Sequence, residues 1–438
     1  MVTQRGRKGL ILAAGAAVLS LALSACGASS DPAPAGSGGG ESPAAQEPVE
    51  LRMSWWGSDA RHEKTNAALD LFEEKNPGIT VVRDFGGFDG YLDKITTQYT
   101  GGNSPDVIQF YNEVLREFAS RGQTLDLNDA VSEGNLSLDG WPKDLLETNT
   151  IDGALSALTF GLSTHAFIFD ETKSAEYGVA VPKEDYTWDD LKTYATAISA
   201  ASGGTVYGVT DLSHSYQVFE VYAKQNGEEF LTADGIGFTK DTLVDYWNYW
   251  SDMREAKAAT PPDVTSEYPS PYDAVVQGTA TSTFLFANQY AGVVGTAPNP
   301  LALMRMPGEG DTPGQYLRAA MNLIISSQSK HPAEAAKLVN FLLNDPEANA
   351  ILGIDRGVPA NADVVKDATA DVDEANAKAI ALIESVRENG AAAPVPAPTG
   401  SGTVNTMFAE FAQQVQFGKL SASDAADQFL AQAKSELG

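Results

Sequence analysis

The first regular pattern of apolar and polar residues begins near residue 50. The residues of Leu51–Trp56, LRMSWW, alternate between apolar and polar side chains with the period of a half-buried β-strand. The alternation ends at the second tryptophan, and Ser58 or Asp59 can cap a helix that continues through Phe72. The pattern predicts a strand followed by a helix, with two tryptophans at the carboxyl end of the strand.

The same order of strand and helix recurs twice in the following residues. A strand is predicted over Ile79–Arg83 and a helix over Tyr91–Tyr99, with a glycine-rich loop between them. A third strand over Asp106–Phe110 precedes a helix over Glu113–Ser120, which Gly122 closes. Strands that alternate with helices predict a parallel, right-handed βαβ layer.

The rest of the chain contains shorter apolar runs and several amphipathic segments. Thr187 is expected to cap a helix, and we assign the two acids that follow Trp188 to the dipole of that helix. The aromatic stripe of Trp247 and Trp250 has helical spacing and is expected to be core. The strands predicted in this part are Ser163–Phe169, Tyr207–Leu212, Thr281–Phe286, Leu301–Met306 and Leu317–Ser326, and the helices are Thr239–Lys257, Ala333–Leu343, Glu374–Glu388, Met407–Phe417 and Ser423–Leu437.

Composition and charge narrow the class of protein. The chain has 438 residues, which is enough for two domains, and a hydrophobic content of 43% supplies substantial cores. Its net charge of −29 argues against binding to nucleic acid or to an anionic membrane surface through side chains. The four histidines never pair at metal-ligand spacing, and no nucleotide or dinucleotide loop is complete. We therefore expect no metal, no cofactor and no catalytic residues.

The first 48 residues have the composition of a targeting segment. A positive stretch at Arg5–Lys8 and an apolar stretch at Leu10–Leu23 precede Cys26, the single cysteine. This arrangement resembles a bacterial lipoprotein signal, with residues 1–25 removed and a lipid on Cys26. An ordinary secretory peptide and an uncleaved anchor are the alternatives. Residues 26–48 then form a flexible tether, and the lipid would anchor the protein to the outer face of the bacterial cytoplasmic membrane.

The tryptophan pair is the first candidate for a ligand site. In open α/β sheets, ligands bind at the carboxyl ends of the strands. An indole face suits the apolar face of a sugar ring, and its N–H can reach a hydroxyl. Because adjacent strand residues point to opposite faces, we expect one of Trp55 and Trp56 in the core and the other against ligand.

Short sequence signatures follow one another in a fixed order over most of the chain. They are Trp55–Ser58, Gly90–Lys94 with Gly101–Val107, Ala166–Asp170, Tyr177–Val179, Thr187–Leu191, Gly278–Gln289 and Ser329–Ala336. Their number and order resemble the extracellular solute-binding proteins of ABC sugar importers, the maltose-binding-protein class. The chain departs from that pattern at Ala320 and Met321, where two glycines are common, and at Phe169 and Asp170, where Tyr-Asn is common.

The resemblance implies an α/β fold of two lobes, the type II periplasmic-binding-protein fold, with a ligand cleft between lobes joined by crossing strands. Closure about a hinge would bury the ligand and present a new surface to the permease. The crossings should lie near Phe160–His165, Gly278–Ala280 and Ile325–Ser329. Lobe one would then comprise residues 49–159 and 281–324, and lobe two residues 160–280 and 325–438.

Candidate ligand residues are those at strand ends and crossings that would face such a cleft, with Trp56 as the leading stacking platform. His165 has the alternative of a core histidine, and Glu220 that of an acid on a helix surface. Arg61 has the alternative of a solvated cation, and Arg356, a donor from lobe two, that of a surface ion pair. The full set is Trp55, Trp56, Gly57, Ser58, Arg61, Phe85, Gly86, Tyr111, Asn112, Thr164, His165, Tyr216, Glu220, Phe284, Phe286, Asn288, Met321, Asn322 and Arg356.

The resemblance implies the substrate-binding component of an ABC importer. It would capture a sugar, an oligosaccharide or a glycoside, outside the membrane and deliver it to the transmembrane permease subunits. We expect a monomer that reaches the membrane through the lipid on Cys26. An extracellular enzyme that acts on glycans with paired carboxylates is one alternative, because a glycosidase needs only two such groups. A lipoprotein sugar sensor is the other.

Overall fold

The computed structural model describes residues 48–268, 270–310 and 312–438. The predicted signal segment, the lipidation site at Cys26 and nearly all of the predicted tether lie outside the described residues. Within the described part of the chain, no helix is both long enough and apolar enough to cross a membrane.

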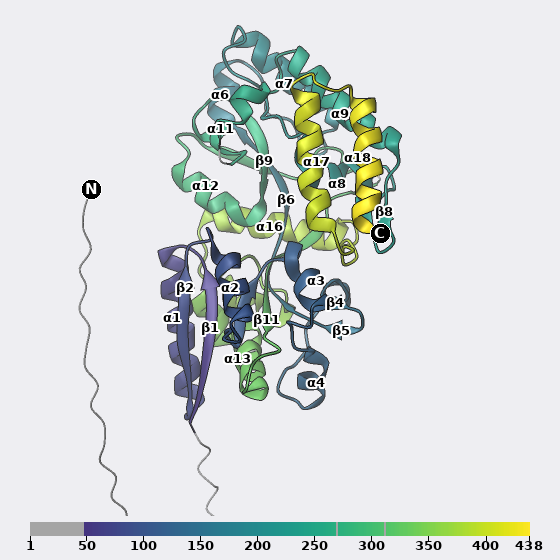
Figure 1. Cartoon of the computed structure of the whole chain (residues 1–438). Helices are drawn as coiled ribbons and strands as arrows, with labels where there is room; N and C mark the ends of the chain where they lie inside the picture. Colours follow the sequence, from purple (N-terminus) through teal and green to yellow (C-terminus); the bar gives the residue numbers. More distant parts are fainter. Residues whose placement is uncertain (1–47, 269, 311) are drawn as a thin grey trace, which may run out of the picture. The chain divides into compact units, whose positions relative to one another are not determined.

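The described residues form a mixed α/β structure (Figure 1). The strands are β1 Val49–Trp56, β2 Ile79–Gly86, β3 Val107–Phe110, β4 Thr150–Ile151, β5 Ala154–Leu155, β6 Leu158–Asp170, β7 Leu231–Thr232, β8 Gly235–Ile236, β9 Ser282–Phe286, β10 Leu301–Met304 and β11 Leu317–Ile325. The helices are α1 Asp59–Lys75, α2 Tyr91–Thr100, α3 Asn112–Ser120, α4 Leu127–Ser132, α5 Lys143–Thr148, α6 Glu171–Glu176, α7 Trp188–Ala201, α8 Tyr216–Gln225, α9 Lys240–Glu255, α10 Pro262–Thr265, α11 Asp273–Val276, α12 Tyr290–Thr296, α13 Pro332–Asn344, α14 Pro346–Leu352, α15 Val365–Ala368, α16 Glu374–Asn389, α17 Ser401–Gln416 and α18 Ala422–Leu437, with short 3₁₀ turns η1 Ala287–Gln289 and η2 Ala362–Val364.

The main sheet combines parallel and antiparallel strands. Its order is β10-β6-β11-β3-β1-β2, and β9 also pairs with β6. β1 pairs in parallel with β2 along its whole length and with β3 at Met53 and Ser54, so the predicted parallel layer is confirmed. β11 runs antiparallel to β3 on one side and to β6 on the other.

Strand β6 connects two halves of the molecule (Figure 1). All of its 13 residues are buried. The sequence predicted only Ser163–Phe169, because a strand that is buried on both faces shows no alternation of apolar and polar residues. Its beginning, Leu158–Thr164, pairs with β11, whereas its end, His165–Asp170, pairs with β9 and β10.

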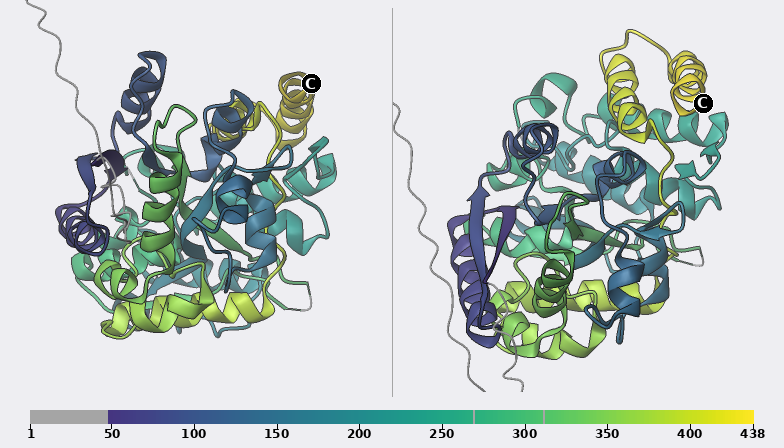
Figure 2. Two further views of the ribbon diagram at one scale, coloured as in Figure 1. Left: turned by 90° about the horizontal axis from the view of Figure 1, so that it is seen from below. Right: turned by 60° about the horizontal axis from the view of Figure 1, so that its bottom comes forward.

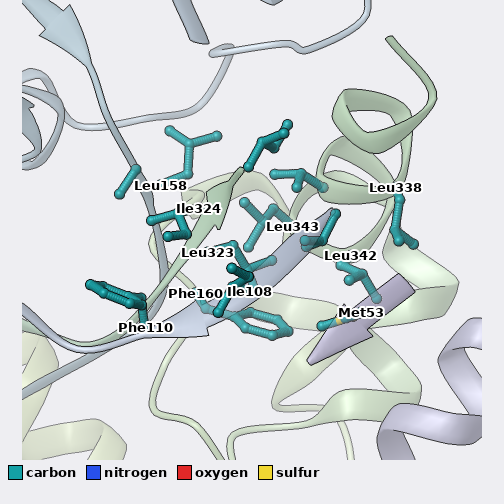
Figure 3. Close-up of a cluster of buried hydrophobic side chains, with 14 of the residues drawn as sticks. Met53, Ile108, Phe110, Leu158, Phe160, Leu323, Ile324, Leu338, Leu342 and Leu343 are labelled. Carbon is teal, nitrogen blue, oxygen red and sulfur yellow. The ribbon is translucent and has the colours of Figure 1, made fainter. Parts of the chain in front are cut away.

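The first half has one large hydrophobic core. Figure 3 shows Met53 of β1, Ile108 of β3 and Ile324 of β11 gathered with Leu342 of α13. Each of these four side chains is fully buried. We call the part of the chain around this core the first half; it comprises β1, β2, β3, β11 and the helices α1 to α5, α13 and α14.

The second half has a core on each face of its sheet. Phe167 and Phe169 of β6 belong to one cluster and Ala166 and Ile168 to another, as expected for alternating strand residues. The predicted core stripe is confirmed, since Trp247 and Trp250 are fully buried. Helices α17 and α18, drawn in yellow, lie side by side and cover this larger cluster (Figure 2).

The structure divides the chain differently from the predicted lobe boundaries. β9 and β10, expected in lobe one, pack in the second half because both pair with the far end of β6. Helices α13 and α14, expected in lobe two, pack in the core of the first half. The segment Asp355–Ala360 also joins the halves, since Val358 lies in a core of the second half and Ala360 in the core of the first. The signatures locate segments, but strand pairing decides which half each one joins.

One predicted strand is wrong. Tyr207–Leu212 makes only isolated bridges, Tyr207 to Ala280 and Val209 to Ala259, and no ladder. The segment packs directly against helix α7, where a Cβ atom on Gly208 would lie 2.0 Å from the Cα of Ala195. The apolar run therefore reflects close packing and not strand pairing.

Candidate functional site

Two hollows are lined by residues of both halves. The smaller has a volume of about 130 Å³ and lies among α3, α5, α8, α17 and β11. The larger is an open space of about 1210 Å³ among α1, α11, α12, α14 and β11. We call them the α3–α17 hollow and the α1–α12 hollow. Among the predicted ligand residues, the first is lined by Asn112, Tyr216 and Glu220, and the second by Ser58, Arg61, Asn288 and Met321.

The two neighbouring tryptophans have different surroundings. Trp55 is fully buried, and its Nε1 donates a hydrogen bond of 3.1 Å to Nδ1 of His62. Phe85, which is 42% exposed, covers Trp55 with a distance of 4.9 Å between the ring centroids. Trp55 is therefore the core member of the pair, and Phe85 shields it from solvent.

Trp56 belongs to an aromatic cluster at the carboxyl edge of the sheet. Its ring centroid lies 5.6 Å from that of Phe88, 4.9 Å from that of Tyr91 and 6.0 Å from that of Tyr111. Trp56 is only 7% exposed, whereas Phe88 is 57% exposed and presents the open surface of the cluster. The sequence did not single out Phe88, although an aromatic residue in a glycine-rich loop after a strand was a usable signal.

The aromatic cluster is connected to residues that line each of the two hollows. Tyr111 is the N-cap residue of α3 and directly precedes Asn112, which lines the α3–α17 hollow. The carbonyl of Trp56 accepts a hydrogen bond of 3.4 Å from Arg61, which lines the α1–α12 hollow. The cluster therefore has one such connection to each hollow.

Glu220 is the most perturbed acid of the α3–α17 hollow. Its carboxylate accepts a hydrogen bond from the Tyr316 hydroxyl, and the residue is 9% exposed. Burial raises the pKa of Glu220 to about 7, although the Tyr316 hydrogen bond and the charges of Lys224 and Arg318 act in the opposite direction. The alternative of an acid on a helix surface is wrong, because Glu220 is buried and lines a hollow.

Two arginines that the sequence analysis did not single out also line this hollow. Arg318 lies over the ring of Phe286, with 4.3 Å between its guanidinium carbon and the ring centroid. Arg116 of α3 donates a hydrogen bond of 3.4 Å to the carbonyl of Pro396, which links the first half to the connector before α17. Their contribution depends on how the two halves pack, which no local pattern in the sequence reports.

Asn322 supports the hollow from behind. It is fully buried in β11, and its Nδ2 donates a hydrogen bond of 2.7 Å to Oδ1 of Asn112. Asn149 donates in turn to Oδ1 of Asn322, over 3.3 Å. The Asn322 side chain therefore orients Asn112, which itself lines the hollow.

Thr164 and His165 are core residues. The Thr164 hydroxyl donates to the carbonyl of Tyr316 over 2.8 Å. The ring of His165 lies among those of Phe284, Phe286 and Tyr316, and it is fully buried. Burial, aided by the charge of nearby Arg318, holds the pKa of His165 well below its usual value. The alternative of a core histidine is the one that the structure has, and neither residue lines the two hollows.

Ser58 and Arg61 begin the wall of the α1–α12 hollow. Of the two predicted cap residues, Ser58 and Asp59, Ser58 is the N-cap of α1. Arg61 forms an ion pair with Asp355 and donates over 3.0 Å to the Asp355 carbonyl, so it is not a freely solvated cation. Gly57 allows this arrangement, since a Cβ atom there would lie 2.2 Å from Cδ of Arg61. Gly86 pairs with Trp56 across β1 and β2.

Other residues of the α1–α12 hollow are tied to the strands behind them. Asn288 accepts a hydrogen bond of 2.6 Å from the Ser163 hydroxyl. Met321 is 8% exposed, and its sulfur accepts a hydrogen bond of 3.5 Å from Nη1 of Arg61. In the described part of the chain, no three His, Cys, Asp or Glu side chains gather in a way that could hold a metal ion.

The prediction for Arg356 is wrong in its location. Arg356 lies in the core of the first half and is 4% exposed, so it is neither a donor from lobe two nor part of a surface ion pair. Its guanidinium donates to Oε1 of Gln109 and to Oγ1 of Thr65, each over 2.7 Å. Burial and the charge of Arg61 lower the pKa of Arg356 to about 9.

Comparisons with known proteins agree with this architecture. A solved structure described as an extracellular solute-binding protein family 1 from Alicyclobacillus acidocaldarius has 29% identity and a TM-score of 0.69, covering 90% of this chain and 99% of that one. A periplasmic oligogalacturonide binding protein from Yersinia enterocolitica, in complex with saturated digalacturonic acid, has 25% identity and a TM-score of 0.74, covering 89% of this chain and all of that one. The predicted two-lobe α/β fold is thereby confirmed.

Curated relatives and a family model give the same assignment. The diacetylchitobiose binding protein DasA of Streptomyces coelicolor is 23% identical over 77% of this chain and 79% of its own length. The chain spans about half the length of the first curated relatives, which come from Brucella species. The model described as "Bacterial extracellular solute-binding protein" matches residues 57–349. The chain therefore belongs to the bacterial extracellular solute-binding protein family.

Proposed function

We propose that the protein is the substrate-binding component of an ABC importer and that its solute is an oligosaccharide or a glycoside. The observation that carries the proposal is the aromatic cluster of Trp56, Phe88 and Tyr111 at the carboxyl edge of the sheet. A large aromatic surface with one exposed ring suits the apolar face of a sugar. The relatives named above support it, because two of them carry saccharide names.

The polar groups beside the cluster supply the hydrogen bonds that a sugar requires. Asn112, Tyr216 and Glu220 line the α3–α17 hollow, next to Tyr111. An ionised Glu220 can accept from two hydroxyl groups through charge-assisted hydrogen bonds, which are stronger than neutral ones. The solute would rest on the aromatic surface with one end in this hollow, and closure of the two halves would cover it.

Delivery requires a membrane partner and a tether. In the proposed cycle the closed protein docks on the transmembrane permease and releases the sugar there. A lipid on Cys26 and the tether of residues 26–48 would keep the protein at the outer face of the cytoplasmic membrane. Mass spectrometry of the protein from its native membrane tests this part, since a diacylglycerol on Cys26 adds a defined mass and an unmodified cysteine contradicts it.

A panel of sugars tests the binding function directly. Diacetylchitobiose, digalacturonic acid, maltose, cellobiose and xylobiose are added separately, and the melting temperature is measured. A ligand that binds only the native state raises the melting temperature. At a ligand concentration one hundred times the dissociation constant, the native state is stabilised by about 2.7 kcal/mol. No shift with any saccharide in a broader panel, or release of shortened sugar during incubation, contradicts the proposal; sugar release would favour the glycan-acting enzyme.

Trp56→Ala sharpens the test. We expect the variant to bind the sugar at least tenfold more weakly, because the loss of about 1.4 kcal/mol of contact energy is sufficient. Trp141→Ala is the matched control: Trp141 is 8% exposed, against 7% for Trp56, and lies in the same core without lining either hollow. Calorimetric titration should show lost affinity for Trp56→Ala alone, and equal losses in both variants would refute the role of Trp56.

A further inference from the structure

Arg356 occupies an unusual position for an arginine. It is 4% exposed in the core of the first half, and its hydrogen-bond acceptors, Gln109 and Thr65, are neutral. Its guanidinium also lies 4.6 Å from the ring centroid of Phe160, a residue labelled in Figure 3. Burying a cation among neutral groups costs free energy of folding. The hydrogen bonds of Arg356 therefore indicate what the buried guanidinium does in the structure.

The first contact path leads from Arg356 to Trp56. Arg356 donates through Nε to Oε1 of Gln109 over 2.7 Å, which leaves the amide nitrogen of Gln109 to point the other way. That nitrogen donates to the carbonyl of Trp56 over 3.2 Å. The hydroxyl of Tyr91, whose ring packs on Trp56, donates to the carbonyl of Gln109 over 3.1 Å. Gln109 is therefore held between Arg356 and the aromatic cluster.

A second path starts from the preceding residue. Asp355 forms an ion pair with Arg61, and its carbonyl accepts from the same guanidinium over 3.0 Å. Arg61 also donates to the carbonyl of Trp56 over 3.4 Å. Asp355 and Arg356 are thus both connected to the carbonyl oxygen of Trp56, Asp355 through Arg61 and Arg356 through Gln109.

The segment that carries these residues is locked to the strand that joins the halves. Leu162 of β6 and Val358 exchange backbone hydrogen bonds of 2.6 and 3.1 Å. Glycines make this close approach possible: a Cβ atom on Gly161 would lie 2.4 Å from the Arg356 carbonyl oxygen, and one on Gly357 would lie 2.3 Å from that of Leu162. The segment that carries Asp355 and Arg356 is therefore fixed to β6.

We propose that Asp355 and Arg356 are positioning residues that hold the backbone of Trp56 and thereby orient the aromatic cluster relative to β6. Neither residue needs to touch the solute. The consequence for binding rests on the proposed function, whereas the orientation of Trp56 does not. A change at Arg356 should therefore alter the environment of Trp56 even without ligand.

The test combines Arg356→Met with Gln109→Leu in a double-mutant cycle. The fluorescence of Trp56 is obtained as the difference between each protein and the same protein carrying Trp56→Phe. Acrylamide quenching of this difference reports the environment of Trp56 without ligand. We expect each single variant to change that quenching constant at least twofold and to weaken binding of the tightest sugar of the panel at least threefold. Because both act through one path, the double variant should be no worse than the worse single variant. An unchanged quenching constant, or additive losses, would overturn the proposal.

Two further variants separate positioning from simple stability. Asn344→Leu removes hydrogen bonds to Trp141 and Ser137 in the same core, and these reach no residue of the aromatic cluster. It should lower the melting temperature while leaving the Trp56 quenching and the affinity as in the parent; a matching change in quenching would contradict the proposal.

If Arg356→Met does not fold, Arg356→Lys takes its place, because it keeps the charge but has one nitrogen for the two acceptors. If no sugar binds the parent, the proposed function fails while the quenching result still decides this proposal.

Discussion

The two hollows between the halves have different chemistry. The α3–α17 hollow is small and is lined by Asn112, which follows Tyr111 of the aromatic cluster, and by Glu220, a buried acid. The α1–α12 hollow is roughly nine times larger by the volumes given above, and acids such as Asp371 on its wall are exposed. A sugar needs aromatic contact and desolvated hydrogen-bonding groups, and a buried acid lines the smaller hollow, whereas Asp371 of the larger one is exposed. We therefore favour the smaller hollow for the proposed solute.

The largest expected effect concerns stability and pH. The pKa of Glu220 is raised to about 7, above an ordinary value of 4.5, so the folded state prefers the protonated form. Its contribution to stability is full below about pH 4.5 and is lost as the pH rises through about 7. A shift of this size corresponds to about 3 kcal/mol. Urea unfolding at pH 5 and pH 8 should show that Glu220→Gln, which does not titrate, loses less stability than the parent on going to pH 8.

Exposed acids provide the comparison for that result. Asp371→Asn in the α1–α12 hollow is the matched variant, because it removes one carboxylate from an exposed position. If Glu220→Gln followed the parent curve, the acid of the α3–α17 hollow would not be distinguished by burial. The charged neighbours Lys224, Arg318 and Glu229 are unchanged in the variant, so they do not account for a difference.

The next effect concerns affinity. Glu220→Gln should weaken sugar binding about tenfold at pH 8, because a carboxylate acceptor is replaced by a neutral amide and the loss of about 1.4 kcal/mol is enough. Asp371→Asn should leave the affinity unchanged. Calorimetric titration of both variants measures the difference directly. Loss of binding in Asp371→Asn, with Glu220→Gln intact, would place the solute in the larger hollow instead.

The contrast between the hollows also marks what the sequence could predict. Alternation over Leu51–Trp56 predicted β1 and the two opposed tryptophans, because a half-buried strand shows its faces in its pattern. The same approach missed the start of β6, where every residue is buried. It also placed Arg356 in the wrong half, because the pairing that brings it beside Gln109 joins residues 247 positions apart. Local patterns identify elements, whereas the hollows depend on contacts between distant ones.

The smallest effect concerns the open face of the aromatic cluster. Phe88 is 57% exposed, so Phe88→Ala removes contact area for a solute with little loss of core packing. We expect about threefold weaker sugar binding, equivalent to about 0.6 kcal/mol, and a melting temperature close to that of the parent. Phe417→Ala is the matched control, because Phe417 is 53% exposed and lines neither hollow. Titration of both variants decides whether the exposed ring beside Trp56 contacts the solute. An affinity of Phe88→Ala equal to that of the parent would exclude that contact, and an equal loss in Phe417→Ala would show that the loss does not depend on the position of the ring.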